Sequence, residues 1–487
     1  MGVQGIDVRN EKLSDEVFFE SRKNILGRWE TGKEIDLEES FDYVKSLPRN
    51  KIMMFSLLDA RGGGYCLTLP RGGVPLLEDM IYWHRTLEKE GDEHVILPVT
   101  IDSYTRAERF KEIDKALDAS RREKRSVLNG FPTVNHGIKA CRQLTESSSK
   151  PINALGGNPQ PGLTVETSFS SGFTGFLGSG VCVPIAYSKH VSIEQGIKNY
   201  QYVDRLTSIY QQNDVPLYRE TAGFLTGMLV PAGVKIALTI IDAVLMVEQG
   251  VRYLGIGYGP QLNILQDTAA VLVLKEVCEE YLKKFGYENI DLFQTLYSLT
   301  GAFPENIGMA YGTIAMVACT AGLTGVQGVN VKTVDEAKAV PVVGNSCLAT
   351  KLTRQVLNII GGNRYPHTPE LDFEKELLKR EVHMIIDKVL EMGDGDIAIG
   401  TVLAFKYGIL DCPWSPNLCV KGKVVGARDY MGVVRYLDHG NMPIPQDIVQ
   451  YHQEALRKRA DHLKVPVNYE LVMTDLLSIA NGSKLTI

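Results

Sequence analysis

Residues 233–259 read GVKIALTIIDAVLMVEQGVRYLGIGYG, and they contain one helix and one strand of a repeating pattern. The first part predicts an apolar helix that only Lys235, Asp242 and Glu248 interrupt. Gly250 is a stop signal for that helix, and the apolar run after it is typical of a buried strand. A helix that leads directly into a buried strand is the building unit of a parallel sheet.

Short apolar runs of this kind recur from about residue 60 and alternate with helical patterns. An eight-stranded barrel accommodates them if one run is misread, whereas an open doubly wound sheet normally uses fewer strands. The candidate strands are 65–69, 94–101, 126–129, 152–154, 173–177, 215–220, 251–257, 290–297 and 328–332.

We therefore predict an α/β fold built on a TIM-type (β/α)8 barrel over residues 56–350. A polar, mostly helical arm precedes the barrel at residues 1–55, where Asp36 and Glu39 have the spacing of a capping box. A C-terminal α/β extension follows at residues 351–487, and we expect it to pack on the barrel.

Composition argues for a small-molecule ligand. The chain has 487 residues, with 52 Lys and Arg against 58 Asp and Glu, and it contains no basic tract of the kind that binds nucleic acid. Its eight cysteines form no CxxC pair and the N-terminus has no apolar signal core, so we expect a cytoplasmic protein. Residues 309–331 carry no charge, but their four glycines and three threonines favour a buried helix, a turn and a strand over a membrane span.

Polar residues at the ends of the predicted strands are the first candidates for a site, because a barrel gathers its strand ends around one mouth. Two guanidiniums at such a mouth can hold a carboxylate by paired hydrogen bonds. The sequence therefore predicts an acid-binding enzyme. The strand-end candidates are Arg71, Arg106, Asn129, Glu220 and Lys332.

Both arginines also have plainer interpretations. Arg71 follows Pro70 and precedes two glycines, which suits either close approach of a ligand or a surface loop. Thr105 and Glu108 have the spacing of a capping box, which would place Arg106 in the first turn of a helix. A cation there opposes the helix dipole, and that small cost favours a role toward a ligand.

Lys332 and Glu336 leave similar alternatives open. Lys332 ends an apolar strand and is either a polar ligand contact or a Schiff-base lysine. Thr333 and Glu336 again have capping-box spacing, so Glu336 either binds a ligand or only initiates a helix.

Common cofactor and metal motifs are absent from the sequence. The nine histidines form no metal-binding pair, and we predict no metal site. There is no Walker loop and no GxSxG elbow. The glycines of Gly255-x-Gly257-x-Gly259 lack the spacing of a dinucleotide fingerprint.

Several motifs, collinear from about Trp29 to the final helix, resemble the large epsilon subunit of glutamate mutase, also called methylaspartate mutase. They are LPRGGV (69–74), TIDSYTR (100–106), LNGFP with VNHG (128–137), QYVDRL (201–206), LTGMLVP (225–231), GYG with QD (257–267), VKTVDEA (331–337), GDIAIGT (395–401) and VRYLDHGN (434–441).

The resemblance implies an adenosylcobalamin-dependent isomerase that rearranges a carbon skeleton through radicals, with substrate and adenosyl group inside the barrel. In this family a separate small subunit holds the corrin through a DxHxxG histidine. This chain has no such motif, so the resemblance implies a small cobalamin-binding partner. It also implies a heterotetramer of two large and two small subunits built on a dimer of the large subunit.

The resemblance also assigns residues. The positions that match its substrate contacts are Arg71, Arg106 and Tyr187. The positions that match its cofactor contacts are Gly73, Asn129, Ala186, Phe303, Lys332, Glu336 and Val340, with Ala186 in place of a proline and Val340 a mild change.

Four substrate positions depart from the family pattern. Leu155 replaces the third arginine that binds carboxylate, and Gly156 replaces the histidine after it. Leu177 replaces the carboxylate that receives the substrate ammonium, and Val183 replaces a second tyrosine. A buried ammonium without its partner is costly, so we expect the leucines and Val183 to line an apolar side and glutamate to bind poorly.

The substrate expected from these changes is an acid that lacks a free α-amino group or carries an apolar or aromatic portion there, such as a 2-oxo acid or a precursor in antibiotic biosynthesis. Three alternatives stay open. In the first, the chain is an authentic glutamate mutase subunit with a repacked site. In the second, it is a cobalamin-independent barrel lyase that uses Lys332 as a Schiff base. In the third, it is a non-catalytic scaffold for the small subunit.

Overall fold

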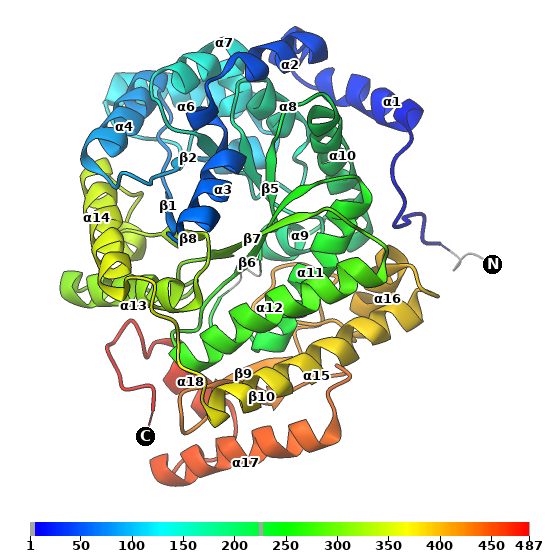
Figure 1. Cartoon of the computed structure of the whole chain (residues 1–487), viewed down its shortest axis with the longest axis vertical. Helices are drawn as coiled ribbons and strands as arrows, with labels where there is room; N and C mark the ends of the chain where they lie inside the picture. Colours follow the sequence, from blue (N-terminus) through cyan, green and yellow to red (C-terminus); the bar gives the residue numbers. More distant parts are fainter. Residues whose placement is uncertain (1–4, 224–226, 487) are drawn as a thin grey trace.

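The computed structural model describes residues 5–223 and 227–486, and its centre is a parallel eight-stranded barrel (Figure 1). Backbone bonds from Ile96 N to Thr68 O and from Thr100 N to Gly72 O, both 2.9 Å, join the first strand to the second and close the ring. The predicted fold class is thus confirmed. The strands are β1 (Leu67–Pro70), β2 (Leu97–Thr100), β3 (Ile152–Leu155), β4 (Gly175–Leu177), β5 (Tyr218–Glu220), β6 (Tyr253–Tyr258), β7 (Asp291–Leu296) and β8 (Gly328–Val331).

The candidate strand that was misread is residues 126–129. It forms a loop that crosses the end of β2, where Phe131 N donates to Thr100 O (2.8 Å). Asn129 uses its side-chain oxygen to accept from Ser103 N (2.9 Å), which holds this loop against the next one. Asn129 therefore stands in a loop and not at a strand end.

The helices of the barrel follow the apolar periodicity of the sequence. The helix predicted from residue 233 is α11, which is buried over nearly its whole length between the barrel and α15, and β6 follows it as expected. The helices of this region are α4 (Leu77–Glu90), α5 (Ser103–Arg106), α6 (Phe110–Glu123), α7 (Thr133–Glu146), α8 (Gly162–Ser170), α9 (Cys182–Tyr187), α10 (Ile193–Gln212), α11 (Ala232–Glu248), α12 (Ile264–Lys284), α13 (Ile307–Thr324) and α14 (Val343–Ile360).

The uncharged segment forms α13, a turn and β8, in the predicted order. By length and composition α13 could cross a membrane, yet it packs against α12 and α14 at the outside of the barrel. Only its inner face is buried, with Ala310, Ile314 and Val317. The helix is only partly buried, and not buried as expected, because α13 belongs to the outer ring.

The N-terminal arm consists of α1 (Asp15–Leu26), η1 (Glu30–Glu34), α2 (Leu37–Ser46), η2 (Arg49–Lys51) and α3 (Met53–Gly63). Asp36 caps α2 by accepting from Glu39 N (2.9 Å), as predicted. The Glu39 carboxylate does not return to the cap and instead pairs with Arg142. Met53 and Leu57 of α3 enter the lower barrel core, so this helix plugs the amino-terminal end of the barrel.

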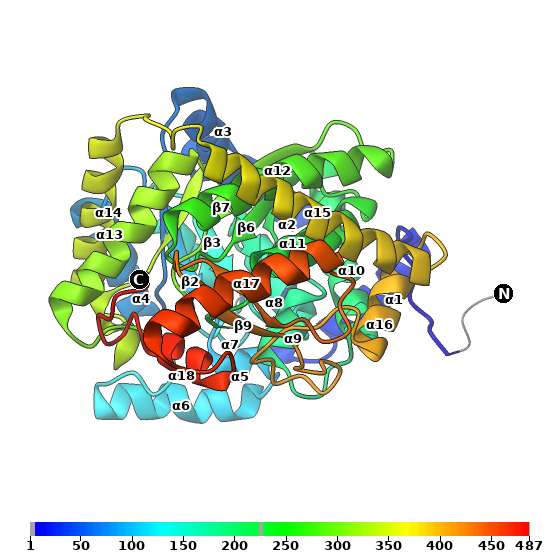
Figure 2. The same cartoon turned by 90° about the horizontal axis from the view of Figure 1, so that it is seen from below.

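The chain beyond residue 360 forms α15 (Pro369–Met392), α16 (Ile397–Tyr407), the antiparallel pair β9 (Val425–Arg428) and β10 (Val434–Asp438), α17 (Gln446–Leu463) and α18 (Tyr469–Leu476). Helix α15 lies against α11 and α12 on one side of the barrel (Figure 2). Buried Arg435 joins Glu374 of α15 (2.7 Å) to Asp429 (3.0 Å) and thereby ties the small sheet to that helix. Residue 55 lies inside α3 and residue 350 inside α14, and the three-part division stays a prediction.

Candidate active site

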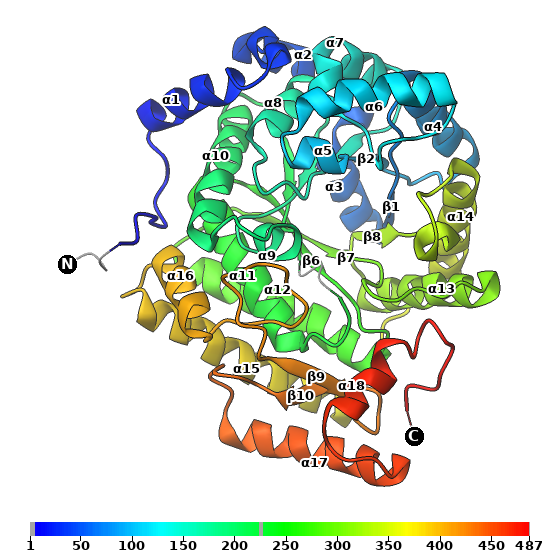
Figure 3. The same cartoon turned by 180° about the vertical axis from the view of Figure 1, so that it is seen from behind.

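A cavity of about 280 Å³ opens at the carboxyl end of the barrel, on the side where α5 and α9 lie (Figure 3). This is the end opposite to α3, and it collects the residues that follow the strands. The cavity brings together most of the substrate positions singled out in the sequence. Its lining residues are Arg71, Thr100, Arg106, Leu155, Gly156, Gly157, Leu177, Tyr187, Gly227, Tyr297, Ser298, Thr300, Gly301, Asn330, Lys332 and Glu336.

Arg71 extends β1 toward the mouth, because its backbone N–H still bonds to Val331 O (3.1 Å). The two glycines after it serve packing. A Cβ on Gly72 would lie 2.7 Å from the Trp83 ring, and one on Gly73 would lie 2.8 Å from Thr100 O. The missing Cβ at Gly73 thus gives room to the neighbouring strand end, and a contact of Gly73 with a ligand stays a prediction.

Arg106 lies in the last turn of the short helix α5, and not in a first turn. Asp102 caps this helix by accepting from Tyr104 N (2.9 Å) and Thr105 N (3.0 Å). The predicted cap at Thr105 was wrong because Asp102, three residues earlier, fills that role and Thr105 only donates its hydroxyl to it. Arg106 therefore stands at the helix end that favours a cation, and the argument from an opposed dipole fails.

The side chain of Arg106 is free to bind an anion. Its Nε is buried without a hydrogen-bond partner, and its guanidinium lies 5.5 Å from the centre of the Tyr187 ring. Burial lowers the pKa of Arg106, Tyr187 raises it and nearby Arg71 lowers it again. Among the described residues, neither Arg71 nor Arg106 has a carboxylate partner. Two cations without counter-ions at one cavity fit the predicted acid-binding role.

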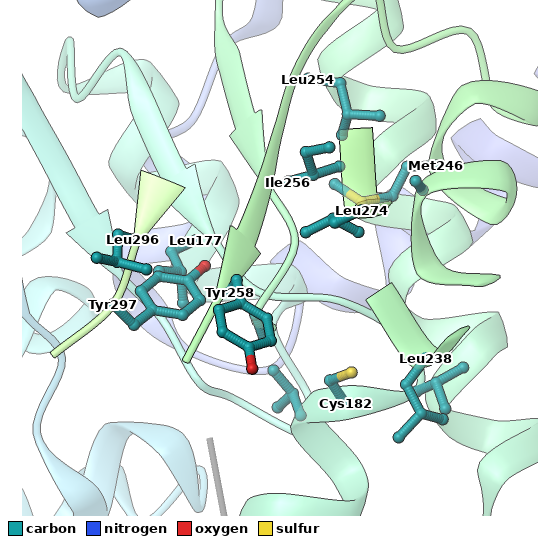
Figure 4. Packing of buried hydrophobic residues seen from close by; sticks show 14 of the residues in the cluster. Leu177, Cys182, Leu238, Met246, Leu254, Ile256, Tyr258, Leu274, Leu296 and Tyr297 are labelled. Carbon is teal, nitrogen blue, oxygen red and sulfur yellow. The ribbon is translucent and has the colours of Figure 1, made fainter. Parts of the chain in front are cut away.

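One part of the cavity wall is apolar. Leu155 and Leu177 are register partners on β3 and β4, and both line the cavity as predicted. Tyr297 also lines the cavity, and Figure 4 labels it in the same view as Leu177. Val183 does not take part, since it is fully buried in the first turn of α9 and faces the protein core. The expectation for Val183 was wrong.

Gly156 contributes only backbone to the cavity. A Cβ there would meet the Phe176 ring at 2.8 Å and Leu177 O at 2.9 Å. A side chain at this position therefore requires the backbone to shift.

Lys332 and Glu336 form the polar end of the cavity, with 2.6 Å between Nζ and the carboxylate. Lys332 is only 5% exposed. Burial lowers the pKa of Lys332, Glu336 opposes this and Arg71 adds to it. Thr333 caps the short 3₁₀ helix η3 (Val334–Ala337), while the Glu336 carboxylate turns to Lys332. Glu336 thus does more than initiate a helix.

Four predicted cofactor positions besides Gly73 lie outside the lining of this cavity. Asn129 and Val340 are exposed in loops, and Ala186 precedes Tyr187 at the end of α9. Phe303 is buried beside a very small void behind Lys332. Their roles stay predictions. Leu225 and Thr226, which begin the motif LTGMLVP, lie outside the described residues.

Glu220 ends β5 as predicted but is sealed beneath the cavity. Burial raises the pKa of Glu220 to about 7, although the hydroxyls of Tyr297, Thr295 and Tyr218 oppose that rise. Neither carboxyl oxygen makes a hydrogen bond of regular geometry.

The glycines of β6 explain how this cluster fits into the barrel. A Cβ on Gly255 would overlap the Tyr218 hydroxyl, and one on Gly257 would overlap the Tyr297 ring. The GxGxG run therefore makes room for two aromatic side chains.

Sequence reasoning missed Tyr297, Asn330 and Thr100 as lining residues. The signal was available, because inward-facing positions alternate along a strand. Asn330 is two residues before Lys332, on the same face of β8.

The chain resembles known proteins over nearly its whole length. The methylaspartate mutase E chain (MutE) family matches residues 47–486. The chain belongs to this family. Three relatives are glutamate mutase epsilon subunits: that of Treponema denticola is 40% identical over 97% of this chain and 98% of its own, that of Desulfitobacterium hafniense 39% over 98% of each, and that of Yersinia enterocolitica 38% over 98% and 99%. Within this mutase family, the barrel mouth described above is the candidate active site.

Proposed function

We propose that the chain is the large component of an adenosylcobalamin-dependent carbon-skeleton mutase that acts on a carboxylic acid without a free α-amino group. As a member of the methylaspartate mutase E chain family it is an isomerase component. One observation carries the substrate proposal. One cavity is lined by Arg71 and Arg106, which have no carboxylate partner among the described residues, and by the apolar Leu155 and Leu177.

The charges of the cavity suit an acid better than an amino acid. Glu336 is the only acidic side chain among the described lining residues, and it is already paired with Lys332. An ammonium group placed against Leu177 would lose its hydration without gaining a counter-ion, at a cost of roughly 3–5 kcal/mol. A carbonyl or an apolar substituent at that carbon carries no such penalty.

In this proposal each side chain has a limited task. Arg71 and Arg106 bind the substrate carboxylate, Tyr187 contacts the substrate beside Arg106, and the leucines exclude water. Lys332 and Glu336 offer a donor and an acceptor that fit ribose hydroxyls, with Gly73, Asn129, Ala186, Phe303 and Val340 as further predicted contacts of the adenosyl group. The cofactor, when bound, supplies the radical chemistry.

A cavity of about 280 Å³ has room for a small acid but not for a corrin. We infer that a small cobalamin-binding subunit holds the corrin outside the barrel, in a heterotetramer of two large and two small subunits. All eight cysteines are free, in keeping with the cytoplasmic location expected from the sequence.

Authentic glutamate mutase is the second candidate, and the names of the relatives favour it. The decisive experiment is to co-express the chain with its small partner, add adenosylcobalamin and compare kcat/KM for L-glutamate and for 2-oxo acids of similar length. The proposal expects glutamate to be the poorer substrate by about 100-fold or more, because about 3 kcal/mol corresponds to that ratio. Turnover of glutamate as efficient as that of the oxo acids would overturn the proposed substrate class.

A further inference from the structure

The C-terminal extension sends one loop back to the rim of the cavity. This loop, residues 412–419, reads CPWSPNLC and follows α16. Figure 3 shows the orange chain beyond α16 passing beside α9, and Figure 2 shows the same arrangement from below.

Trp414, at the tip of the loop, has a strained backbone. Its φ is +65°, which bulky residues seldom adopt. Such a conformation costs roughly 1–3 kcal/mol and persists only where surrounding contacts impose it. The side chain is 44% exposed, so burial of the ring is not what holds it.

The contacts that hold Trp414 lead to the cavity wall. Its indole N–H donates to Met228 O (2.8 Å), and its ring faces Gly227, where a Cβ would lie 3.2 Å away. Gly227 lines the cavity. The Met228 side chain in turn fills the space beside Gly301, another lining residue, where a Cβ would lie 2.1 Å from it. Trp414 thus fixes one side of the cavity through residues 227 and 228.

The residues after Trp414 hold the helix that carries Tyr187. Ser415 Oγ donates to Ile185 O (2.7 Å), and Asn417 Nδ2 donates to Pro184 O (3.1 Å). On the far side of Tyr187, Asn417 also donates to Val191 O (2.9 Å). Asn417 is 3% exposed. The backbone is therefore held before and after Tyr187, whose ring lies against Arg106.

We propose that Trp414 and Asn417 are positioning residues of the candidate site, through which the C-terminal extension sets the place of Gly227 and Tyr187 around the bound acid. The proposal rests on the proposed function only in that the cavity binds an acid. It gives the extension a role in substrate binding besides its packing on the barrel.

The test compares Trp414→Phe with Tyr469→Phe in the complete complex with its small subunit and cofactor. Trp414→Phe keeps an aromatic ring and removes the indole N–H, while Tyr469 is an exposed aromatic residue at the start of α18. We expect Trp414→Phe to raise KM by about tenfold with kcat nearly unchanged, because positioning of a bound ligand is lost. Wild-type KM in Trp414→Phe, as in the control, would overturn the proposal.

Fluorescence of the intact chain gives a second readout in case Trp414→Phe does not fold. The chain has three tryptophans, Trp29, Trp83 and Trp414, so replacing the first two by Phe leaves Trp414 as the only reporter. Succinate, used as a dicarboxylate probe, should change its emission saturably, and adding Arg71→Ala should abolish the response. Emission that does not respond to succinate would count against the proposal.

KM is measured with whichever acid the complex turns over, so a preference for glutamate would overturn the proposed function and leave this inference intact.

Discussion

Leu177 and Glu220 are register partners on the neighbouring strands β4 and β5, and both side chains face the interior of the barrel. Leu177 reaches the cavity, whereas the Glu220 carboxyl turns toward Tyr218, Thr295 and Tyr297 and is 1% exposed. The Glu220 carboxyl is thus withheld from the ligand. Tyr297 donates its hydroxyl hydrogen to Thr221 O, so its oxygen can accept a hydrogen bond from a protonated Glu220.

Glu220→Gln should change how stability depends on pH. The folded-state pKa of Glu220 is raised from 4.5 to about 7, so its contribution is fully present below about pH 4.5 and is lost as pH rises to about 7. Relative to Glu220→Gln, the wild type should lose about 3 kcal/mol over this window. Thermal unfolding of both proteins at several pH values measures the difference. Parallel pH profiles would show that Glu220 titrates normally.

Charge restored at the two leucines should bring back glutamate binding. Leu155 and Leu177 are register partners at the cavity, so Leu155→Arg with Leu177→Glu adds a cation and an anion side by side. We expect kcat/KM for L-glutamate to rise by about 100-fold, as a regained buried charge pair of about 3 kcal/mol predicts. Leu155→Met with Leu177→Met is the control for altered packing. An equal effect of both double variants would refute the charge argument.

Binding of the acid should weaken when Arg106 is replaced by a residue of the same charge but different geometry. Arg106→Lys keeps the charge but loses the two parallel N–H donors that match a carboxylate. We expect KM for the acid to rise by about tenfold or more. Arg109→Lys is the matched control, because Arg109 follows α5 by three residues but is exposed and pairs with Glu112. If Lys at position 106 supports a wild-type KM, a bidentate contact is excluded.

The barrel could be predicted because its signal is local. Apolar periodicity and helix stops placed α11, β6 and α13 correctly. The run at 126–129 was misread because it belongs to a loop that folds over the end of β2, in which only Leu128 of these four residues is buried. The rule that strand ends share one mouth correctly brought Arg71, Arg106 and Lys332 together.

Other parts of the site depend on contacts that no local pattern encodes. Val183 points into the core because of the direction in which α9 leaves β4. Trp414 contacts the cavity rim through a hydrogen bond to Met228, which lies more than 180 positions earlier in the sequence. Neither relationship follows from periodicity or from strand-end position.

The Lys332–Glu336 pair allows a direct test of the Schiff-base alternative. Glu336 raises the pKa of Lys332 against the effect of burial, so Glu336→Gln should lower that pKa and increase the fraction of free amine. We expect acetylation of Lys332 at neutral pH, followed by mass spectrometry, to become several-fold faster, within about tenfold per pKa unit. Lys275 with Glu279 is the control, an exposed pair of the same spacing, where Glu279→Gln should change the acetylation rate of Lys275 little because solvent screens the charge.

Borohydride in the presence of a 2-oxo acid should leave wild-type Lys332 unmodified, since the paired ammonium is no nucleophile. A trapped adduct on Lys332 would instead support the lyase.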